Sequence, residues 1–281
     1  MSQSTYENYS ETSSSYDQIR VPIGVDAILA GLRAGGLEPT HVRLLDAGCG
    51  TGSYLLALSQ HLDRLVGLEV STGMLDRARP KLAHAGNVAL HHGSVLAMPF
   101  ADAAFDAVLF NQVIHHLDTP GDASTTASRP WPNLGRALAE SHRVLSPGGA
   151  LIINTCSQEQ LPECSWYNAL IPDAAARLAR RYVPIDTLVA LLDDLGFDVR
   201  EPHVIREPFS ADRYFDAAGP FDKSWRNGDS IWALVTEREL EAALATLRAQ
   251  HDAGTADTFV RDHDESRQSI GHALILHAWR R

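Results

Sequence analysis

Residues 44–52 read Leu-Leu-Asp-Ala-Gly-Cys-Gly-Thr-Gly, and this stretch is the strongest indication of the fold. An apolar run ends at Asp46, and glycines follow it at the alternate positions Gly48, Gly50 and Gly52. Glycine lets the backbone turn tightly, and it lets a ligand approach where a Cβ atom would collide with it. The stretch therefore predicts a buried strand, then a ligand-binding turn, then the start of a helix.

Short apolar runs and amphipathic stretches alternate on both sides of this turn. The predicted strands are residues 42–46, 65–69, 88–91, 105–110, 150–154, 197–205 and 271–279. The predicted helices are residues 16–37, 52–61, 71–83, 133–145, 184–195 and 236–250. Strands and helices that alternate at this spacing indicate βαβ units. We predict an α/β fold with a doubly wound, seven-stranded, mostly parallel sheet of Rossmann-like type and a helical, aromatic cap insertion.

The pattern changes after Thr155, and we divide the chain into four predicted parts. Residues 1–37 are expected to cover a bound cofactor, and residues 38–206 to form the core that binds it. Residues 207–265, rich in aromatic side chains, are expected to form a cap or lid. Residues 266–281 return to the core as its last strand.

The composition restricts the partners and the compartment. The 281 residues carry a formal net charge of −11, which repels nucleic-acid phosphates and anionic lipid. Three cysteines are too few for a disulfide framework and fit a reducing cytoplasm. No apolar run approaches the ~20 residues that span a bilayer, and the first residues lack an apolar leader. We expect a cytoplasmic monomer or homodimer with a small-molecule substrate, no nucleic acid and no membrane.

The spacing of the glycines bears on which cofactor is bound. Dinucleotide sites follow the pattern GxGxxG, whereas here Gly52 is followed by Ser53 and Tyr54. Glu69 ends the second predicted strand, where an acidic residue can accept both ribose hydroxyls. Asp46 precedes the glycines, where a carboxylate can hold an ammonium group. These features favour S-adenosylmethionine over NAD or FAD.

Four segments resemble the class I S-adenosylmethionine-dependent methyltransferases, in their small-molecule, ubiquinone/menaquinone-methylase-like branch. The segments are LLDAGCGTG (44–52), VGLEVSTGMLDRAR (66–79), GSVLAMPFADAAFDAVLFNQVIHHL (93–117) and ALAESHRVLSPGGALII (137–153). They occur in the order and at the spacing of that family. The resemblance implies S-adenosyl-L-methionine as cofactor and S-adenosyl-L-homocysteine as product.

The resemblance also implies a set of cofactor-binding residues. They are Tyr16, Arg20, Asp46, Gly48, Cys49, Gly50, Glu69, Val70, Met74, Gly93, Ser94, Val95, Asn111 and Gln112. By this resemblance Asp46 and the glycines line the methionine end, and Glu69 binds the ribose. Many relatives have Asp where this chain has Ser94, which weakens the expected contact to the adenine amino group.

The roles of three further pairs also come from the resemblance. Val70 and Met74 are expected to pack on the adenine, and Asn111 to face the methionine moiety with Gln112 beside it. Tyr16 and Arg20 lie in a Tyr-Asp-x-x-Arg stretch that folds over the cofactor in many relatives, where Arg20 can pair with the carboxylate. The alternative is that this last pair only anchors a surface helix.

Two histidines are the candidates for proton transfer. His115 and His116 follow the fourth predicted strand, where its loop opens beside the expected methyl group. A histidine whose pKa lies near ~6.5 is the usual general base at neutral pH. The alternative is a structural role, with one ring capping the next segment.

Aromatic residues outside the matching segments are the candidates for substrate contact. They are Trp166, Tyr167, Tyr214 and Trp225. Aromatic walls suit a planar or apolar acceptor and exclude water. The alternative is that they form the core of a small cap.

A metal site is not predicted. His91 and His92 are adjacent on a strand and so point to opposite faces, and no third ligand stands at a recognised spacing. Cys156 and Cys164 can bind a soft atom such as arsenic, although a buried structural pair is the more common use of such thiols.

We therefore expect a methyltransferase acting on oxygen, nitrogen, carbon or sulfur of a small, aromatic or heterocyclic metabolite. One alternative is a protein or RNA methylase. The other is a cofactor-binding protein on the same fold that transfers no methyl group.

Overall fold

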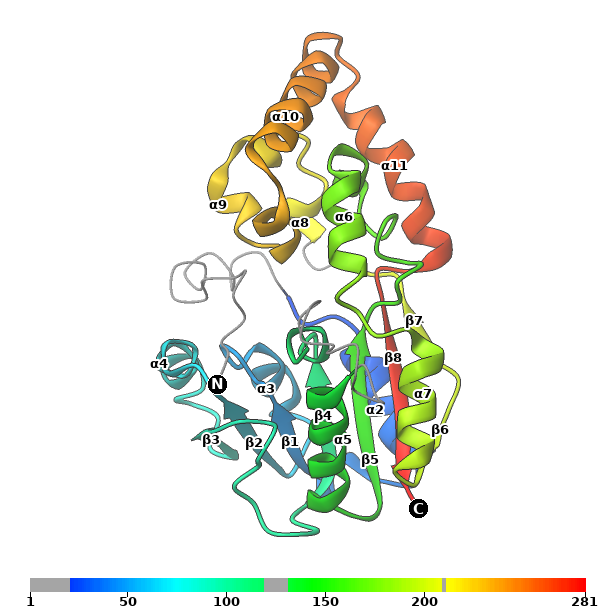
Figure 1. The fold of residues 1–281 in the computed structure, drawn as a ribbon. Coiled ribbons are helices and arrows are strands. Elements are labelled where there is room, and N and C mark those ends of the chain that lie inside the picture. The colour runs from blue at the N-terminus through cyan, green and yellow to red at the C-terminus, as the bar shows by residue number, and fades with distance from the viewer. Residues whose placement is uncertain (1–20, 119–130, 209–210) are drawn as a thin grey trace. The chain divides into compact units, whose positions relative to one another are not determined.

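The computed structural model describes residues 21–118, 131–208 and 211–281 (Figure 1). The chain divides into two compact units, which are described separately. The sheet unit comprises residues 24–155, 183–203 and 275–281. The aromatic unit comprises, among the described residues, 21–23, 156–182, 204–208 and 211–274.

A mostly parallel sheet forms the centre of the sheet unit. Its strands follow the order β3-β2-β1-β4-β5-β8-β6, and β7 also pairs with β8. β1 pairs in parallel with β2 and β4, β2 with β3, and β4 with β5, whereas β6 is antiparallel to β8. The strands are β1 (Arg43–Ala47), β2 (Arg64–Glu69), β3 (Val88–His92), β4 (Phe105–Asn111), β5 (Leu145–Thr155), β6 (Phe197–Val199), β7 (His203–Ile205) and β8 (Ala273–Arg280). This topology confirms the predicted fold class.

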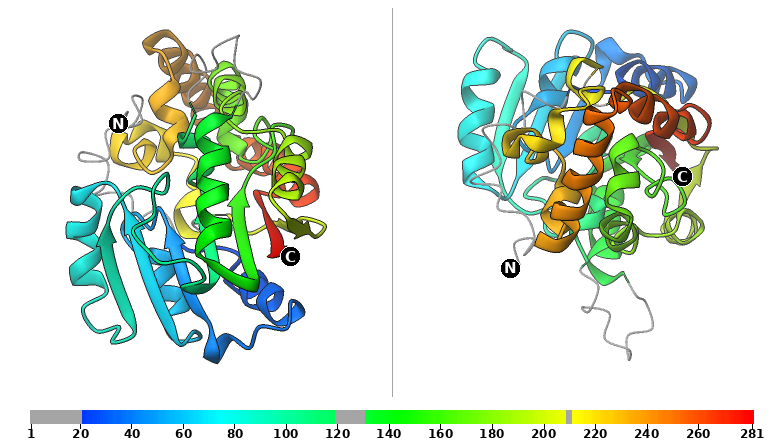
Figure 2. Two further views of the ribbon diagram at one scale, coloured as in Figure 1. Left: turned by 60° about the horizontal axis from the view of Figure 1, so that its bottom comes forward. Right: turned by 90° about the horizontal axis from the view of Figure 1, so that it is seen from above.

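Helices cover both faces of this sheet. α5 and α7 lie in front of it in Figure 1 and α2 lies behind it, and the two views of Figure 2 agree on the opposite placement of α2 and α5. The helical elements of the unit are α2 (Val25–Ala34), η1 (Pro39–His41), α3 (Ser53–Leu58), α4 (Thr72–Lys81), η2 (Ile114–His116), α5 (Pro132–Val144) and α7 (Ile185–Asp194). Because both faces are covered, the central strands are apolar almost throughout.

Burial follows from this layering. Leu44, Leu45, Val108 and Leu151 have no exposed surface, whereas every residue of the edge strand β3 is exposed or half-buried. Burying such side chains is the main favourable term in folding, at roughly 25 cal/mol per Å² of apolar surface. The central strands therefore form a rigid platform, and their carboxyl ends have fixed positions.

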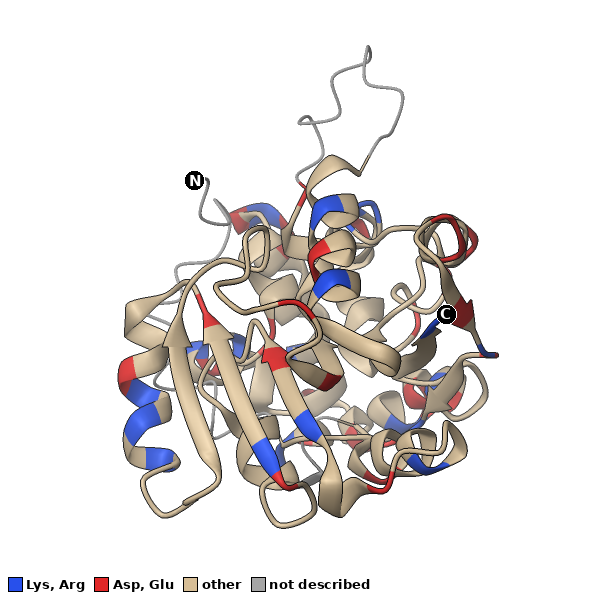
Figure 3. Cartoon of the chain, turned by 90° about the horizontal axis from the view of Figure 1, so that it is seen from below, with Lys and Arg blue, Asp and Glu red and all other residues tan. Residues whose placement is uncertain are grey.

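Charged residues tie the strands together at the opposite, amino edge. The guanidinium of Arg43 donates to the Asp106 carboxylate from Nε at 2.9 Å and from Nη2 at 2.8 Å. These bonds hold the pKa of Asp106 below its usual value. Figure 3 shows basic and acidic segments interspersed over the described strands and helices rather than gathered on one of them.

The aromatic unit is helical. Its elements are η3 (Trp166–Leu170), α6 (Pro172–Ala179), α8 (Ala211–Tyr214), η4 (Gly219–Phe221), α9 (Lys223–Arg226), η5 (Ser230–Leu234), α10 (Glu237–Asp252) and α11 (Ala256–Ile270). α10 begins with a capping box, in which Thr236 and Glu239 each satisfy a backbone amide of the other. Within the described parts of the chain, no helix is both long and apolar enough to cross a membrane.

Three predicted elements need correction. The strand predicted at 197–205 is two short strands, β6 and β7, because Pro202 between them has no amide hydrogen for a ladder. The sheet therefore has eight strands. β5 starts at Leu145 rather than at residue 150, with a shift in its register against β4 that accommodates Pro147-Gly148-Gly149. The described part of the helix predicted from residue 16 starts at Val25.

Four of the described helices, α6, α8, α9 and α11, were not predicted at all, and α11 is the longest of them. The residues of α11 that face inward are Ala256, Val260, Asp264 and Arg267, and two of them are charged. An apolar period is therefore missing from the sequence of this helix. α11 runs through residue 265, where the sequence suggested that the insertion ends. The four-part division of the chain stays a prediction.

Candidate cofactor site and active site

The glycine turn after β1 has a backbone that only glycine adopts readily. Gly48, Gly50 and Gly52 have φ angles of 88°, 52° and 78°. The turn is fixed to the next strand, because the amide of Gly48 donates to the Leu68 carbonyl at 2.8 Å. A Cβ on Gly48 would lie 2.6 Å from Val113, whereas a Cβ on Gly50 would meet no atom of the described residues within 4 Å. Among these residues the backbone of Gly50 thus leaves space for a ligand, as a ligand-binding turn requires.

Asp46 lies at the end of β1 with an unsatisfied carboxylate oxygen. The residue is 2% exposed, and its Oδ1 has no hydrogen-bond partner among the described residues. Burial, followed by the negative charge of Glu69, raises the pKa of Asp46 to about 7. An orphaned buried acceptor of this kind is costly. A cationic ligand group beside Asp46 would remove that cost.

Glu69 ends β2 and is held by backbone amides. Its Oε2 accepts from the Gly50 amide at 3.0 Å, and its Oε1 accepts from the Ser71 amide at 2.8 Å. The Ser71 side chain caps α4 by accepting from the Met74 amide. Each carboxylate oxygen has a second lone pair that remains available to a diol. The glycine turn and the acid predicted to bind ribose therefore meet in one place.

The residues predicted to surround the adenine lie along the ends of β2 and β3. Val70 is 52% exposed, which is unusual for a valine, whereas Met74 is buried. Gly93 follows β3, and its amide donates to the Glu69 carbonyl at 3.0 Å. The Ser94 hydroxyl accepts from the Leu96 amide at 3.2 Å, and Val95 is buried beside it in the sequence.

Asn111 and Gln112 lie at the end of β4. Asn111 accepts from Nδ2 of Asn154, the last residue but one of β5, at 2.8 Å. Gln112 has a φ of 54°, a left-handed conformation that residues other than glycine rarely adopt. Such strain persists only where neighbouring groups enforce it, and it occurs mostly at functional sites.

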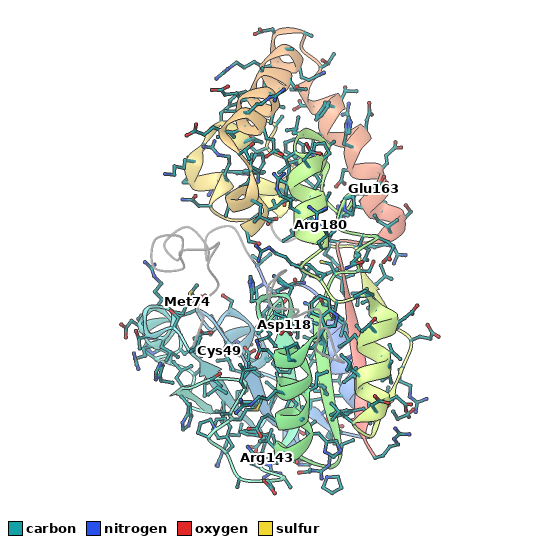
Figure 4. All side chains as sticks on the ribbon, viewed as in Figure 1. Cys49, Met74, Asp118, Arg143, Glu163 and Arg180 are labelled. Atoms are coloured by element: carbon teal, nitrogen blue, oxygen red, sulfur yellow. The ribbon has the colours of Figure 1, made fainter. Side chains whose placement is uncertain are left out.

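The candidate bases follow directly in the 3-10 turn η2. His115 is buried and His116 is half-buried, and their ring centroids are 3.9 Å apart. Asp118, which comes next, accepts from the amides of Asn133 and Leu134 at 3.0 and 2.9 Å, and so caps the start of α5. Figure 4 labels Asp118, Cys49 and Met74 near the carboxyl ends of the strands, with Arg143 at the opposite end of the sheet.

Cys49 contributes its backbone rather than its thiol to this region. Its Sγ occupies the space beside Gly67, where a Cβ would lie 2.7 Å from it. Burial raises the pKa of the Cys49 thiol well above its usual value. The thiol is therefore unreactive, and any contact of Cys49 with a cofactor comes from its main chain.

The four predicted substrate residues lie together in the aromatic unit. Tyr167 is central, with ring centroids 5.7 Å from Trp166, 6.2 Å from Tyr214, 5.3 Å from Trp225 and 5.9 Å from Trp232. All five residues are buried. They form a common core, and their predicted contact with substrate stays a prediction.

Four of these five aromatic residues have their polar side-chain atoms hydrogen-bonded inside the unit, and one does not. Trp166 Nε1 donates to the Tyr214 carbonyl at 2.6 Å, and Trp225 Nε1 donates to the Arg213 carbonyl at 2.9 Å. The hydroxyls of Tyr167 and Tyr214 each donate at 2.6 Å to a carboxylate, the acceptors being Asp229 and Asp264. Trp232 differs, because its buried Nε1 has no partner among the described residues.

The remaining sequence predictions concern thiols, metals and the amino terminus. Cys156 and Cys164 are buried, and their Sγ atoms donate to the carbonyls of His272 and Leu161 at 3.4 and 3.6 Å. Within the described ranges, no three His, Cys, Asp or Glu side chains gather as metal ligands. Tyr16 and Arg20 lie outside the described residues.

Two residues at the carboxyl edge escaped the sequence reasoning. Asn154 has no exposed surface, and its Nδ2 also donates to the Tyr54 hydroxyl, at 3.3 Å. A signal for Asn154 was present, because a polar residue ends a buried parallel strand there, as Asn111 does in β4. Tyr54 gave no such signal, since an aromatic residue in the first turn of a helix is common in cores.

Comparison with known proteins shows what the middle part of the chain is similar to. Residues 45–153 match the family described as "Methyltransferase domain". A demethylmenaquinone methyltransferase of Staphylococcus epidermidis is 32% identical over 123 residues, which are 43% of this chain and 45% of that protein. The alignment thus spans about half the length of the curated relatives.

Solved structures extend the similarity of fold beyond that segment. A crystal structure from Anabaena variabilis, described as a methyltransferase candidate from an antibiotic biosynthesis pathway, has a TM-score of 0.71 at 22% identity and covers 93% of this chain and 99% of its own. The [4+2]-cyclase SpnF has a TM-score of 0.55 at 18% identity, with 97% of this chain and 94% of its own covered. Residues 45–153 are therefore similar to methyltransferase domains, among them that of the demethylmenaquinone methyltransferases, and the solved structures show that the chain shares the methyltransferase fold.

Proposed function

We propose that this protein transfers the methyl group of S-adenosylmethionine to a small aromatic or heterocyclic metabolite, at an oxygen, nitrogen, carbon or sulfur atom. The observation that carries the proposal is the buried Asp46, whose orphaned carboxylate oxygen stands beside an open glycine turn. A structural turn has no use for an unpaired buried carboxylate, whereas a cofactor with an ammonium group supplies its partner.

The other groups at the carboxyl edge fit the remaining parts of that cofactor. The Glu69 carboxylate, fixed by two amides, is suited to accept the ribose hydroxyls. The exposed side chain of Val70 offers an apolar surface to the adenine, beside Ser94. Asn111 and Gln112 are assigned to the methionine part, and Arg20 to its carboxylate.

The bound cofactor supplies an electrophilic methyl group on a sulfonium. The residues of the chain then have three tasks, which are to orient the acceptor in line with that methyl group, to exclude water and to remove a proton where the acceptor carries one. His115 and His116 are the proposed proton acceptors. Their turn is held at the end of β4 by the rigid sheet and, beyond it, by the cap that Asp118 places on α5.

Aromatic side chains support a planar acceptor. The curated relatives are named for demethylmenaquinone, a quinone, and this chain has five buried aromatic rings in one cluster. The polar side-chain atoms of the four predicted residues are hydrogen-bonded inside the aromatic unit, so any contact of these residues with substrate is apolar. The four residues are Trp166, Tyr167, Tyr214 and Trp225. We add Trp232, whose indole N–H remains to be satisfied by an acceptor oxygen. A free metabolite in the cytoplasm, rather than nucleic acid or membrane lipid, also fits the net charge of −11.

A labelled-cofactor experiment tests this function. The purified protein is incubated with methyl-labelled S-adenosylmethionine and a small-molecule metabolite extract. We expect S-adenosylhomocysteine to form only when extract is present, and label to enter a small product. Label entering protein or RNA added to parallel incubations would instead favour the alternative methylases.

Once a product is identified, two matched variants test the aromatic cluster. Trp232→Phe removes the orphan N–H and should raise KM for the acceptor. Trp225→Phe removes an N–H that serves the protein itself, and should lower stability with little effect on KM. A reversed pattern would assign acceptor contact to Trp225.

A second candidate function is cofactor binding without methyl transfer. It is favoured by the similarity in fold to SpnF, which is named a [4+2]-cyclase. In that case the protein binds S-adenosylmethionine, and no S-adenosylhomocysteine forms with any extract.

A further inference from the structure

Asn154, near the end of β5, lies at the carboxyl edge of the sheet. It pairs in register with Asn111 on the neighbouring strand, so the two side chains project on the same face of the sheet. Asn154 has no exposed surface, although it carries a full amide group. A buried amide is tolerated only where its donors and acceptor are used.

The Asn154 side chain uses its polar atoms on three residues. Nδ2 donates to Asn111 Oδ1 at 2.8 Å and to the Tyr54 hydroxyl at 3.3 Å. Oδ1 accepts from Gln112 Nε2 at 3.4 Å. Tyr54 belongs to α3, directly after the glycine turn, while Asn111 ends β4 and Gln112 follows it. One side chain thereby joins the two segments assigned to the methionine end of the cofactor.

The main chain of Asn154 adds a further constraint. Its carbonyl accepts from the Gln112 amide at 2.9 Å, at the residue whose φ is 54°. Asn154 therefore holds Gln112 through backbone and side chain together. This double attachment accounts for a left-handed conformation in a residue that is not glycine.

The bond between the two asparagines has a chemical consequence. Because Oδ1 of Asn111 accepts from Asn154, Nδ2 is the atom of the Asn111 amide that is turned away from Asn154. Asn111 then presents a hydrogen-bond donor rather than an acceptor. A donor is the group that suits a carboxylate, and S-adenosylmethionine carries one at its methionine end.

We propose that Asn154 is a positioning residue that sets the orientation of the Asn111 amide and the backbone of Gln112 toward the methionine end of the cofactor. This inference rests on the proposed location of the cofactor at this edge. Asn154 itself lies behind the two residues and acts through them.

The Asn154→Asp variant tests the proposal, with S-adenosylmethionine and S-adenosylhomocysteine as probes in calorimetric titrations. An ionised carboxylate cannot donate, so Asn111 must turn its Nδ2 toward residue 154 and its Oδ1 toward the cofactor. We expect both dissociation constants to rise about tenfold or more at pH 8, as for loss of a hydrogen bond to a charged group. Protonation restores a donor at residue 154, so the ratio to wild type should shrink as the pH falls toward 6.

Three comparisons make the test decisive. Asn87→Asp is the matched control, because the Asn87 amide binds the carbonyls of Ser59 and Leu62 instead; its dissociation constants should stay within about twofold of wild type. Asn154→Thr, of nearly equal volume, should weaken binding equally at every pH, and it replaces Asn154→Asp if that variant does not melt cooperatively. Glu69→Ala reports on the location of the cofactor.

The outcomes distinguish the role of Asn154 from the location of the cofactor. If Glu69→Ala weakens binding but Asn154→Asp and Asn154→Thr do not, the role of Asn154 is overturned and the location stands. A loss in Asn154→Asp that is equal at pH 8 and pH 6 would also overturn it. If Glu69→Ala leaves binding unchanged, the location itself is wrong.

Discussion

The carboxylates of Asp46 and Glu69 stand at the ends of the adjacent parallel strands β1 and β2, and they repel each other. Asp46 is buried, and the charge of Glu69 adds to that burial in raising its pKa to about 7. Glu69 meanwhile clamps the glycine turn through the amide of Gly50. The protein thus stores an unfavourable charge at the point where a cationic cofactor group is expected.

Replacing the Asp46 carboxylate with a neutral amide should stabilise the protein and abolish the binding of S-adenosylmethionine. The folded-state pKa of Asp46 is raised above its ordinary value, so the folded protein holds a proton that the unfolded chain loses between about pH 4 and pH 7. Its contribution is fully present below that window and is lost as the pH rises through it. Asp46→Asn should therefore raise the free energy of unfolding at pH 8 by roughly 2–4 kcal/mol.

Chemical denaturation of the cofactor-free proteins at pH 8 and pH 4 measures this difference. The gain should close toward pH 4, where Asp46 is already neutral. Wild-type affinity for S-adenosylmethionine should also decline below pH 7, since a protonated Asp46 attracts an ammonium group less strongly. An Asp46→Asn variant that is less stable than wild type at pH 8 would contradict the assigned pKa shift.

Acid should destabilise the sheet unit through His277. This residue of β8 is buried, its ring fills the space beside Gly31, and burial followed by the charge of His203 lowers its pKa to about 4. As the pH falls below 6.5 the unfolded chain takes up a proton that the folded protein refuses. Stability from this group is complete above 6.5, and about 1.4 kcal/mol is lost per pH unit down to pH 4.

The variant His277→Phe keeps a ring of similar size but cannot titrate. Its unfolding free energy should fall less steeply than that of wild type between pH 6.5 and 4, with the exposed His84→Phe as control. The opposite trend of Asp46 offsets part of the slope in wild type, so the comparison is best made in the Asp46→Asn background. Parallel slopes in the two proteins would exclude His277 as the source.

A buried ion pair should be essential to the aromatic unit. Arg267 donates to the Asp264 carboxylate from Nε at 2.7 Å and from Nη2 at 2.6 Å, and the Tyr214 hydroxyl donates to the same carboxylate. Arg267→Met leaves a buried charge without its partner and should cost about 3–5 kcal/mol. The double variant Asp264→Leu/Arg267→Met should recover much of that loss in thermal melts. If the double variant is no more stable than Arg267→Met, the loss of stability comes from altered packing and not from the unpaired charge of Asp264.

His115 should affect the rate rather than cofactor affinity if it is the general base. With an acceptor that carries a proton, His115→Ala should lower kcat by about 10²-fold or more and leave the dissociation constant for S-adenosylmethionine unchanged. The same substitution at His116 distinguishes the two rings, which are 3.9 Å apart. An intact rate in His115→Ala removes that residue from the mechanism.

The fold of the sheet unit was predictable because its central strands are buried on both faces. Leu44 and Val108 belong to apolar runs that end at polar or glycine residues, and this signal depends only on local sequence. α11 was not predictable in this way, since its inward face carries Asp264 and Arg267, which become favourable there only when they pair. Likewise, the break between β6 and β7 depends on which neighbour each strand meets.

For the candidate site, sequence anticipates the arrangement where residue identity alone implies the chemistry. Gly50 and Glu69 were expected together, and the structure joins them by a hydrogen bond of 3.0 Å. The contacts of Asn154 were not predictable, because they depend on the register of β5 against β4. Trp232 differs from Trp166 and Trp225 because its indole N–H has no partner among the described residues. This difference was equally unpredictable, since it depends on which carbonyl each indole N–H reaches.

The most direct test of the account is calorimetric titration of S-adenosylmethionine into wild type, Asp46→Ala and Glu69→Ala. Asp102→Ala, which removes an exposed carboxylate paired with Arg143 at the other end of the sheet, is the control. The account predicts binding to wild type and to the control with similar affinity, and at least about tenfold weaker binding to both site variants. Unchanged affinity in Asp46→Ala and Glu69→Ala would contradict it.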